Sequence, residues 1–236
     1  MKTPQNIKLK HLAIIMDGNR RWAKKNLLKA IDGHKKGAAQ IKAVAKQAVK
    51  QEVQKLSLYA FSSENWNRSQ EEINLLQELL LNYLKSKDLQ EVVDSNIWVK
   101  IIGDISKFNK EVILGIKNLE EKMQTTFSTL KPKMILNIAL NYGSRDEIVH
   151  AINKIIKNNQ NLTNITHQDI AKNLYETEDV DLLIRSGGNK RLSNFLLWQA
   201  SYSELYFTDI LWPDFTQEHF NDAVEFFYKQ KRNFGT

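Results

Sequence analysis

The sequence has no cysteine and only three prolines in 236 residues. The absence of cysteine excludes disulfides, thiolate metal sites, iron–sulfur clusters and a cysteine nucleophile, and it is typical of a reducing compartment. No apolar run approaches the ~20 residues that a membrane span needs, and the N-terminus shows no apolar signal core. We therefore expect a cytoplasmic protein. Because no Gly/Ser-rich linker or internal repeat interrupts the chain, we expect a tail over residues 1–10 and a single domain over residues 11–236.

Positive charge exceeds negative charge, since 34 Lys and Arg residues against 27 Asp and Glu residues give a formal charge of +7. This balance is typical of proteins that bind an anionic partner, whether nucleic acid, a phosphorylated small molecule or an acidic membrane face. It is also typical of a protein that is merely kept in solution, so charge alone does not choose among these partners.

Short β-rich runs alternate with longer segments that carry apolar residues at helical spacing. The runs cover residues 11–16, 55–61, 97–103, 133–141, 180–185 and 203–207. Apolar periodicity predicts a helix over residues 69–94, while Ser69 with Glu72, and Ser144 with Glu147, match capping boxes that open helices. The alternation predicts an α/β fold with a mostly parallel six-stranded sheet and helices on both faces. In such sheets ligands bind beyond the carboxyl ends of the strands.

Polar and basic residues follow four of the predicted strands, over residues 17–22, 62–68, 142–145 and 186–194. Each of these turns contains arginine together with glycine, an amide or a hydroxyl. Arginine binds phosphate through a bidentate fork, and glycine lets the backbone approach an anion closely. His34, near the start of the next helix, is a further candidate donor. One such turn is typical of an ordinary surface loop, but four of them at strand ends predict one polyanion site.

The absence of two loop motifs narrows the kind of polyanion. No GxxxxGK[ST] or GxGxxG loop follows a strand, which argues against nucleoside triphosphates and dinucleotides. Asp17 is the acid among the basic groups, and a single carboxylate that faces several phosphates can hold Mg²⁺. The apolar helix over residues 69–94 is either simply buried or lines a hydrophobic tunnel that opens at the strand ends, as a prenyl diphosphate would require. Candidate wall residues of such a tunnel are Ala60, Leu76, Leu80, Ile101, Leu136 and Ile138.

Seven blocks of the sequence together resemble the cis-prenyltransferase family, in particular its bacterial undecaprenyl diphosphate synthases. The blocks are "HLAIIMDGNRRWAKK", "GHKKG", "LSLYAFSSENWNR", "LNIALNYGSRDEI", "VDLLIRSGG", "RLSNFLLWQASYSELYFTDILWPDF" and the "FG" near the end. The resemblance implies a homodimer with a hydrophobic tunnel, and a Mg²⁺-dependent isoprenyl transferase that adds isopentenyl diphosphate to farnesyl diphosphate. The implied product is undecaprenyl diphosphate, the lipid carrier precursor for cell-wall synthesis, with transient contact at the inner membrane face for its release.

The resemblance also implies roles for individual residues. Asp17 would hold Mg²⁺ against the allylic diphosphate, and Glu204 would be the second metal-linked acid. Asn65 is the residue assigned to proton acceptance in the family, although a diphosphate oxygen or a water held by Asn65 is an equally good acceptor chemically. Substrate contacts are implied for Gly18, Asn19, Arg20, Arg21, Trp22, His34, Ser62, Ser63, Glu64, Trp66, Arg68, Arg185, Arg191, Leu192 and Ser193. Residues 193–215 resemble the family's dimer interface.

Several positions depart from the family pattern. Arg20 stands at a usual Gly, Ala30 at a usual Arg, Ser69 at a usual Pro, Asn189 at a usual Glu and Asn233 at a usual basic residue. Two other hypotheses remain: a catalytically silent homologue, which the intact Asp17 and Arg21 argue against, and nucleic-acid binding. We expect no nucleic-acid partner, because the sequence carries no recognisable nucleic-acid motif.

Overall fold

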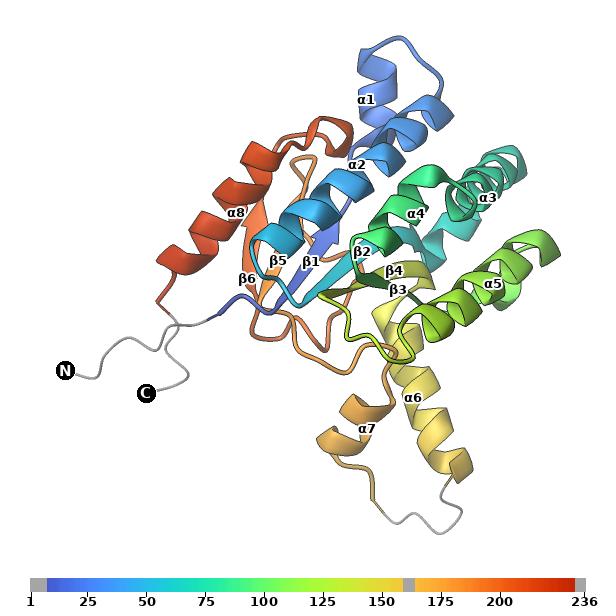
Figure 1. Cartoon of the computed structure of the whole chain (residues 1–236), viewed down its shortest axis with the longest axis vertical. Helices are drawn as coiled ribbons and strands as arrows, with labels where there is room; N and C mark the ends of the chain where they lie inside the picture. The colour runs from blue at the N-terminus through green and yellow to red at the C-terminus, as the bar shows by residue number, and fades with distance from the viewer. Residues whose placement is uncertain (1–7, 159–163, 232–236) are drawn as a thin grey trace.

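The computed structural model describes residues 8–158 and 164–231, which fold around one six-stranded parallel sheet (Figure 1). The strand order is β3-β4-β2-β1-β5-β6. The six predicted strands are all confirmed, as β1 (His11–Ile15), β2 (Lys55–Ser62), β3 (Ile97–Ile102), β4 (Met134–Tyr142), β5 (Leu182–Arg185) and β6 (Glu204–Phe207). All neighbouring strands pair in parallel. Their carboxyl ends therefore lie along a single edge of the sheet.

Alternate residues of the strands point to opposite faces of the sheet, and each face is covered differently. Leu12 and Ile14 belong to a large apolar cluster with residues of α2 (Ala30–Lys50), α4 (Lys87–Asp94), α5 (Lys110–Thr126) and α8 (Gln217–Lys229). Figure 1 shows these helices ranged across one side of the sheet. Ala13 and Ile15 belong to a smaller cluster that includes residues of the irregular segment 192–200.

The second face carries a thinner cover than the first. Segment 192–200 packs there with the first turn of α6 (Ser144–Asn158), and the Ser144 amide donates to the Asn194 carbonyl at 2.8 Å. Ser193, Asn194 and Leu196 all have positive φ angles. A helix cannot pass through such residues, so this β5–β6 connection crosses the sheet without regular structure.

Two predictions about helices are wrong in detail. The helix expected over residues 69–94 is divided into α3 (Gln70–Leu84) and α4, because Ser86 begins a new helix by accepting a hydrogen bond from the Leu89 amide at 3.1 Å. Ser69 caps α3 as expected, accepting from the Glu72 amide at 3.3 Å. The predicted capping box of Ser144 and Glu147 does not form. The Glu147 side chain is buried and accepts hydrogen bonds from Tyr142 and Gln199 instead.

Two short helices complete the described structure, α1 (Asn19–Lys25) and α7 (His167–Asn173). In Figure 1 α1 stands at one end of the molecule, beside the start of α2. Within the described residues no helix is both long and apolar enough to cross a bilayer.

Candidate active site

The site lies at the carboxyl ends of β1 and β5, which are neighbours in the middle of the sheet. After β1 the chain moves to β2 on one side, and after β5 it moves to β6 on the other. A ligand crevice is expected where the strand order reverses in this way. Ile15 pairs with Arg185 in the sheet, so Asp17 leaves β1 directly beside the end of β5. Two of the predicted site residues, distant in sequence, are thereby brought into contact.

The Asp17 carboxylate receives hydrogen bonds from three side chains. Arg21 Nη2 donates to Oδ1 at 3.0 Å, while Arg185 Nη2 and Asn189 Nδ2 donate to Oδ2 at 2.9 and 2.8 Å. Burial alone would raise the pKa of Asp17, but the donors from Asn189, Arg185 and Arg21 outweigh it and hold the pKa below its usual value. Asp17 is therefore an anion at neutral pH.

Two glycines allow the loops to approach one another this closely. Gly18 has a φ of 116°, which lets the chain turn from β1 directly into α1. Gly187 has a φ of 82°, and its carbonyl accepts a hydrogen bond from Arg21 Nη1 at 2.6 Å. A Cβ atom at Gly187 would lie 2.6 Å from Arg21 Nη2. Glycine is therefore needed here for both its conformation and its small size.

A polar pocket of about 360 Å³ opens beside Asp17. Arg20 and Arg68 both approach Glu72 Oε1, at 3.8 and 2.8 Å. Burial, with Arg68 and Arg20 nearby, lowers the pKa of His34 to about 4, so this side chain is neutral at physiological pH. The described residues that line the pocket are Met16, Asp17, Gly18, Asn19, Arg20, Arg21, His34 and Arg68. Three arginines against one carboxylate make it a site for an anion.

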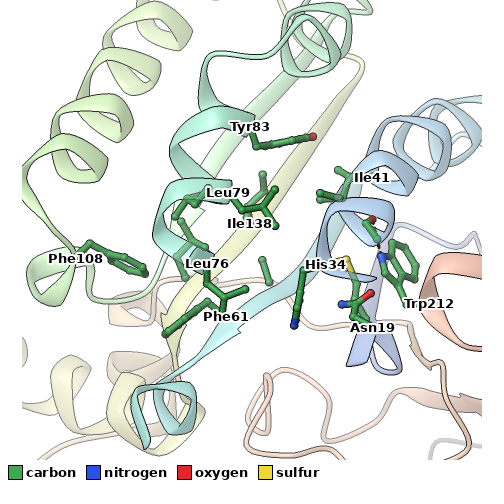
Figure 2. Close-up of a pocket in the computed structure, with 16 residues that line it drawn as sticks. Asn19, His34, Ile41, Phe61, Leu76, Leu79, Tyr83, Phe108, Ile138 and Trp212 are labelled. Atoms are coloured by element: carbon green, nitrogen blue, oxygen red, sulfur yellow. Dashed lines mark hydrogen bonds between the residues drawn. The ribbon is translucent and has the colours of Figure 1, made fainter. Parts of the chain in front are cut away.

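An apolar pocket of about 100 Å³ adjoins the polar one, between α2 and α3 (Figure 2). The two pockets share Met16, Asn19 and His34. Figure 2 shows Leu76 and Leu79 on one side and Ile41 on the other, with His34 and Asn19 towards one end. Of the candidate tunnel residues, four line this pocket, namely Ala60, Leu76, Leu80 and Ile138, whereas Ile101 and Leu136 do not. A polar mouth therefore leads into an apolar interior.

Two polar atoms at the junction of these pockets have no hydrogen-bond partner among the described residues: Asn19 Oδ1 and His34 Nε2, both buried. Buried polar atoms are normally paired. Both residues line the polar pocket and the apolar pocket.

A second polar pocket, of about 630 Å³, lies on the other side of Arg185. Arg185 is only 4% exposed and donates through Nη1 to Ser193 Oγ at 2.7 Å and to the Arg191 carbonyl. The Asn194 side chain donates to Glu64 at 3.1 Å and accepts from the Arg145 amide at 3.0 Å. The lining residues are Ser62, Glu64, Arg145, Leu192, Ser193, Asn194 and Leu197. Arg185 thus stands between two anion-sized pockets and orders a wall of the second.

The segment after β2 forms a short 3-10 helix, Ser63–Asn67, at the same edge of the sheet. Asn65 Oδ1 accepts a hydrogen bond from the Ser62 amide at 3.2 Å. Trp66 Nε1 donates to Asn141 Oδ1 at 2.8 Å, and the Trp66 ring packs against Phe61 and Phe108. The side-chain oxygen of Asn65 thus already has a hydrogen-bond partner.

One predicted site residue lies elsewhere. Glu204 begins β6 and pairs with Leu182, whereas Arg185 pairs with Phe207 at the other end of the same strand. At ~3.3 Å per residue, Glu204 therefore lies about 10 Å behind the edge of the sheet that carries Asp17. Within one chain the strand thus sets Glu204 apart from Asp17, and the role of Glu204 as a second metal-linked acid stays a prediction.

The structure also adds residues that the sequence did not assign to the site. Asn189, which lies in the predicted polar turn after β5 and departs from the family pattern, binds Asp17 directly. Glu72 was expected to cap α3, yet its carboxylate lies between Arg20 and Arg68. Asn194 was passed over within the turn after β5, although an amide beside the predicted Ser193 was a usable signal.

The residues at Asp17 fit a magnesium ion that is bound together with a substrate. The described part of the chain contains no group of three His, Asp or Glu side chains that could hold a metal alone. Mg²⁺ commonly takes one or two protein carboxylates and completes its shell with phosphate oxygens and water. Asp17, as the one carboxylate among the described residues lining the polar pocket, supplies such a ligand.

The same architecture occurs in known proteins. A family model described as "Putative undecaprenyl diphosphate synthase" matches residues 15–235. The chain is 42% identical over 228 residues to an isoprenyl transferase of Neisseria meningitidis serogroup B. The match covers 96% of this chain and 89% of that protein. It is 44% identical over 240 residues to the ditrans,polycis-undecaprenyl-diphosphate synthase ((2E,6E)-farnesyl-diphosphate specific) of Buchnera aphidicola subsp. Schizaphis graminum, with 99% and 94% covered.

A solved structure extends the likeness to three dimensions. Lavandulyl diphosphate synthase from Lavandula x intermedia, in complex with dimethylallyl diphosphate, aligns with a TM-score of 0.90 at 32% identity, covering 97% of this chain and 99% of that one. Sequence and fold therefore match over nearly the whole length, including every loop that forms the two polar pockets. On this basis the chain belongs to the undecaprenyl diphosphate synthase family of prenyltransferases.

Proposed function

We propose that the protein is a Mg²⁺-dependent cis-prenyltransferase that condenses isopentenyl diphosphate with farnesyl diphosphate and makes a long-chain polyprenyl diphosphate, undecaprenyl diphosphate. One observation carries the proposal: the cluster of Asp17, Arg21 and Arg185 stands between two polar pockets, one of which continues into an apolar pocket. A diphosphate with a prenyl tail needs this combination. The printed names of the relatives support the choice of farnesyl diphosphate and of the product.

The two pockets suit the two substrates. The allylic diphosphate binds beside Asp17, Arg20 and Arg21, and its tail enters the apolar pocket past His34 and Asn19. The diphosphate of isopentenyl diphosphate binds in the pocket walled by Ser193 and its neighbours, on the far side of Arg185. Arg185 then fixes the distance between the two heads, and holding two reactants in one geometry is a large part of catalysis for a nucleophile as weak as an alkene.

Ionisation of the allylic diphosphate leaves an allylic cation and a departing polyanion. When bound, Mg²⁺ supplies positive charge that stabilises this leaving group. The guanidinium groups of Arg20 and Arg21 add donors aimed at the same oxygens. Asp17 anchors the assembly, because Arg21, Arg185 and Asn189 fix both of its carboxylate oxygens.

Asn65 positions the group that accepts the final proton. A neutral amide is a very weak base, and its carbonyl oxygen already accepts from the Ser62 amide. The amide nitrogen of Asn65 can instead donate to a diphosphate oxygen or a water, and that oxygen takes the proton from the new carbon chain.

The apolar pocket has to widen as the product grows. Its volume of about 100 Å³ is too small for the tail of a long-chain polyprenyl product. Its walls include side chains of α2 and α3 and, from the sheet, of β2 and β4. Movement of α3 away from α2 is one way in which the pocket can take a longer chain.

The same proposal includes an oligomeric state and a cellular role for the protein. We expect a homodimer, with a role in cell-wall biogenesis and transient membrane contact for release of the product. β6 is an edge strand of the sheet, and Leu205 within it and Tyr202 just before it are exposed. Exposed apolar side chains on an unpaired edge are typical of a surface that another chain covers.

The test is incorporation of radiolabelled isopentenyl diphosphate into lipid extracted after incubation with farnesyl diphosphate and Mg²⁺. Chromatography should show long-chain products, and EDTA should abolish them. A protein that binds both diphosphates but yields no product under these conditions is a silent homologue. Salt-dependent retention of nucleic acid in a gel shift, without prenyl transfer, would favour the nucleic-acid hypothesis instead.

A further inference from the structure

The turn between α1 and α2 carries two leucines on the outside of the molecule. Leu27 is 95% exposed, which is the highest value among the large hydrophobic side chains of the described residues, and Leu28 is 48% exposed. In Figure 1 this turn stands out at one end of the molecule. Scattered exposed leucines need no explanation, but adjacent ones at a protruding apex are unusual.

The backbone makes the exposure of Leu27 more notable. The Leu27 amide donates to the Lys24 carbonyl at 3.2 Å and the Leu28 amide to the Ala23 carbonyl at 2.9 Å, the two hydrogen bonds that end a helix in a Schellman motif. In that motif Leu27 occupies the left-handed position, with a φ of 57°. Glycine normally stands there, because a side chain is strained in this conformation. A strained residue that is also 95% exposed is a candidate for a function outside the fold.

Positive charge surrounds the two leucines. Residues 20–36 contain seven basic residues and a single acid, Asp32, so this short segment carries almost the whole net charge of the chain. Lys24, Lys25 and Lys29 are exposed, and none of them takes part in the ion pairs found among the described residues. Leucines ringed by lysines are complementary to a bilayer with anionic headgroups.

The turn is also held rigidly next to the active site. α1 begins with Asn19, which lines both pockets, and ends at Lys25, so the leucines lie about 10 Å from the diphosphate site at 1.5 Å per residue. Trp22, in the middle of α1, donates to Asp214 at 2.7 Å and ties the helix to the body of the protein. A surface that engaged Leu27 and Leu28 would therefore lie about one length of α1 from the residues that line the pockets.

We infer that residues 24–29, the sequence "KKNLLK", form a membrane-docking tip. Leu27 and Leu28 enter the boundary between headgroups and acyl chains, while Lys24, Lys25 and Lys29 meet the lipid phosphates. This inference deepens the proposed function and rests on it for its purpose: a polyprenyl diphosphate leaves with its head at headgroup level and its tail moving into lipid. The docking itself needs no substrate.

The experiment measures sedimentation of the full-length, substrate-free protein with vesicles of phosphatidylcholine alone or mixed with phosphatidylglycerol. Wild type should bind the mixed vesicles more tightly. Leu27→Ser with Leu28→Ser should weaken binding at least about tenfold, and Lys24→Gln with Lys25→Gln about fivefold per lysine. The matched control replaces Leu114 and Leu130, which are 59% and 50% exposed elsewhere, with serine. Equal loss in both serine variants, or no preference for anionic vesicles, overturns the inference.

A single substitution separates docking from a structural role. Leu27→Gly relieves the positive φ and should raise the denaturation midpoint, while it lowers vesicle affinity. If vesicle affinity is unchanged, or if the leucine variants shift the oligomeric state by size exclusion, the tip contacts the protein's own chains and the inference fails. Incorporation of isopentenyl diphosphate in detergent should stay at the wild-type level in these variants. If wild type incorporates isopentenyl diphosphate but does not bind vesicles, the docking inference fails and the proposed function stands. If wild type binds vesicles through the tip but incorporates no isopentenyl diphosphate, the proposed function fails and the docking tip stands.

Discussion

Replacing Asp17 with Asn removes one negative charge from the centre of the site while preserving the shape of the side chain. The bond from Arg185 is the larger loss, because that side chain is 5% exposed and a hydrogen bond to a charged group contributes about 1.5–3 kcal/mol. The bond from Arg21 contributes at most about 1 kcal/mol, since its side chain is 50% exposed. We therefore expect Asp17→Asn to lower the free energy of unfolding by about 2–4 kcal/mol at pH 7.

This loss should depend on pH in a defined direction. The folded pKa of Asp17 lies below the ordinary value of 3.8, so the carboxylate stabilises the fold above the unfolded-state pKa, and this stabilisation disappears as pH falls through the folded pKa. The difference in the free energy of unfolding between wild type and Asp17→Asn should thus be constant near neutrality and shrink below about pH 4. Urea unfolding at a series of pH values measures it, with Asp222→Asn on α8 as an exposed control.

The same substitution should reduce turnover by about 10²–10³-fold, the effect typical of removing one preorganised electrostatic contact from an active site. Incorporation of labelled isopentenyl diphosphate at saturating substrate provides the measurement. A variant with a wild-type unfolding midpoint would show that Asp17 is not the anchor of the loops. A variant with less than about a tenfold loss of turnover would show that Asp17 is not the metal ligand. A constant stability difference down to pH 3 would refute the assigned pKa shift.

Three further predictions follow from the pockets. Because the pKa of His34 is about 4, the pH–rate profile should lack a step near 6.5 from this residue, and His34→Gln should retain more activity than His34→Phe. Gly187→Ala should destabilise the fold by about 1–3 kcal/mol and abolish incorporation, because its Cβ would lie 2.6 Å from Arg21 Nη2; a wild-type melting curve would contradict this. Ala38→Leu fills the apolar pocket and should shorten the products on thin-layer chromatography, whereas Ala39→Leu, next to it on the exposed side of α2, should not.

The sheet could be predicted from the sequence because each strand is a short apolar run with its own local signal. Helix boundaries were less accessible: apolar residues recur at helical spacing over residues 69–94, and only the cap at Ser86 shows that this segment contains two helices. The pair of Ser144 and Glu147 matched a capping motif, yet burial gave Glu147 other partners. Local motifs thus identified elements well and their ends less well.

The candidate site was predictable in kind for a similar reason. In a parallel sheet every carboxyl end lies on one edge, so residues that follow strands must gather there, as Asp17 and Arg185 do. The same rule places Glu204, the first residue of β6, towards the opposite edge of the sheet in this chain. Asn189 could not be assigned from sequence, because its role depends on the positive φ angles of Gly187 and Gly188, which aim the turn back at Asp17.

By itself the sequence determined the α/β class, the anionic nature of the ligand and the family, because these depend on composition, periodicity and short motifs that do not require long-range contacts. Only the tertiary structure decided which donors hold Asp17, how the polar pockets join the apolar one, and that Leu27 and Leu28 project outwards beside the site. These features arise from side chains that are distant along the chain and meet only when strand order and backbone turns bring them together.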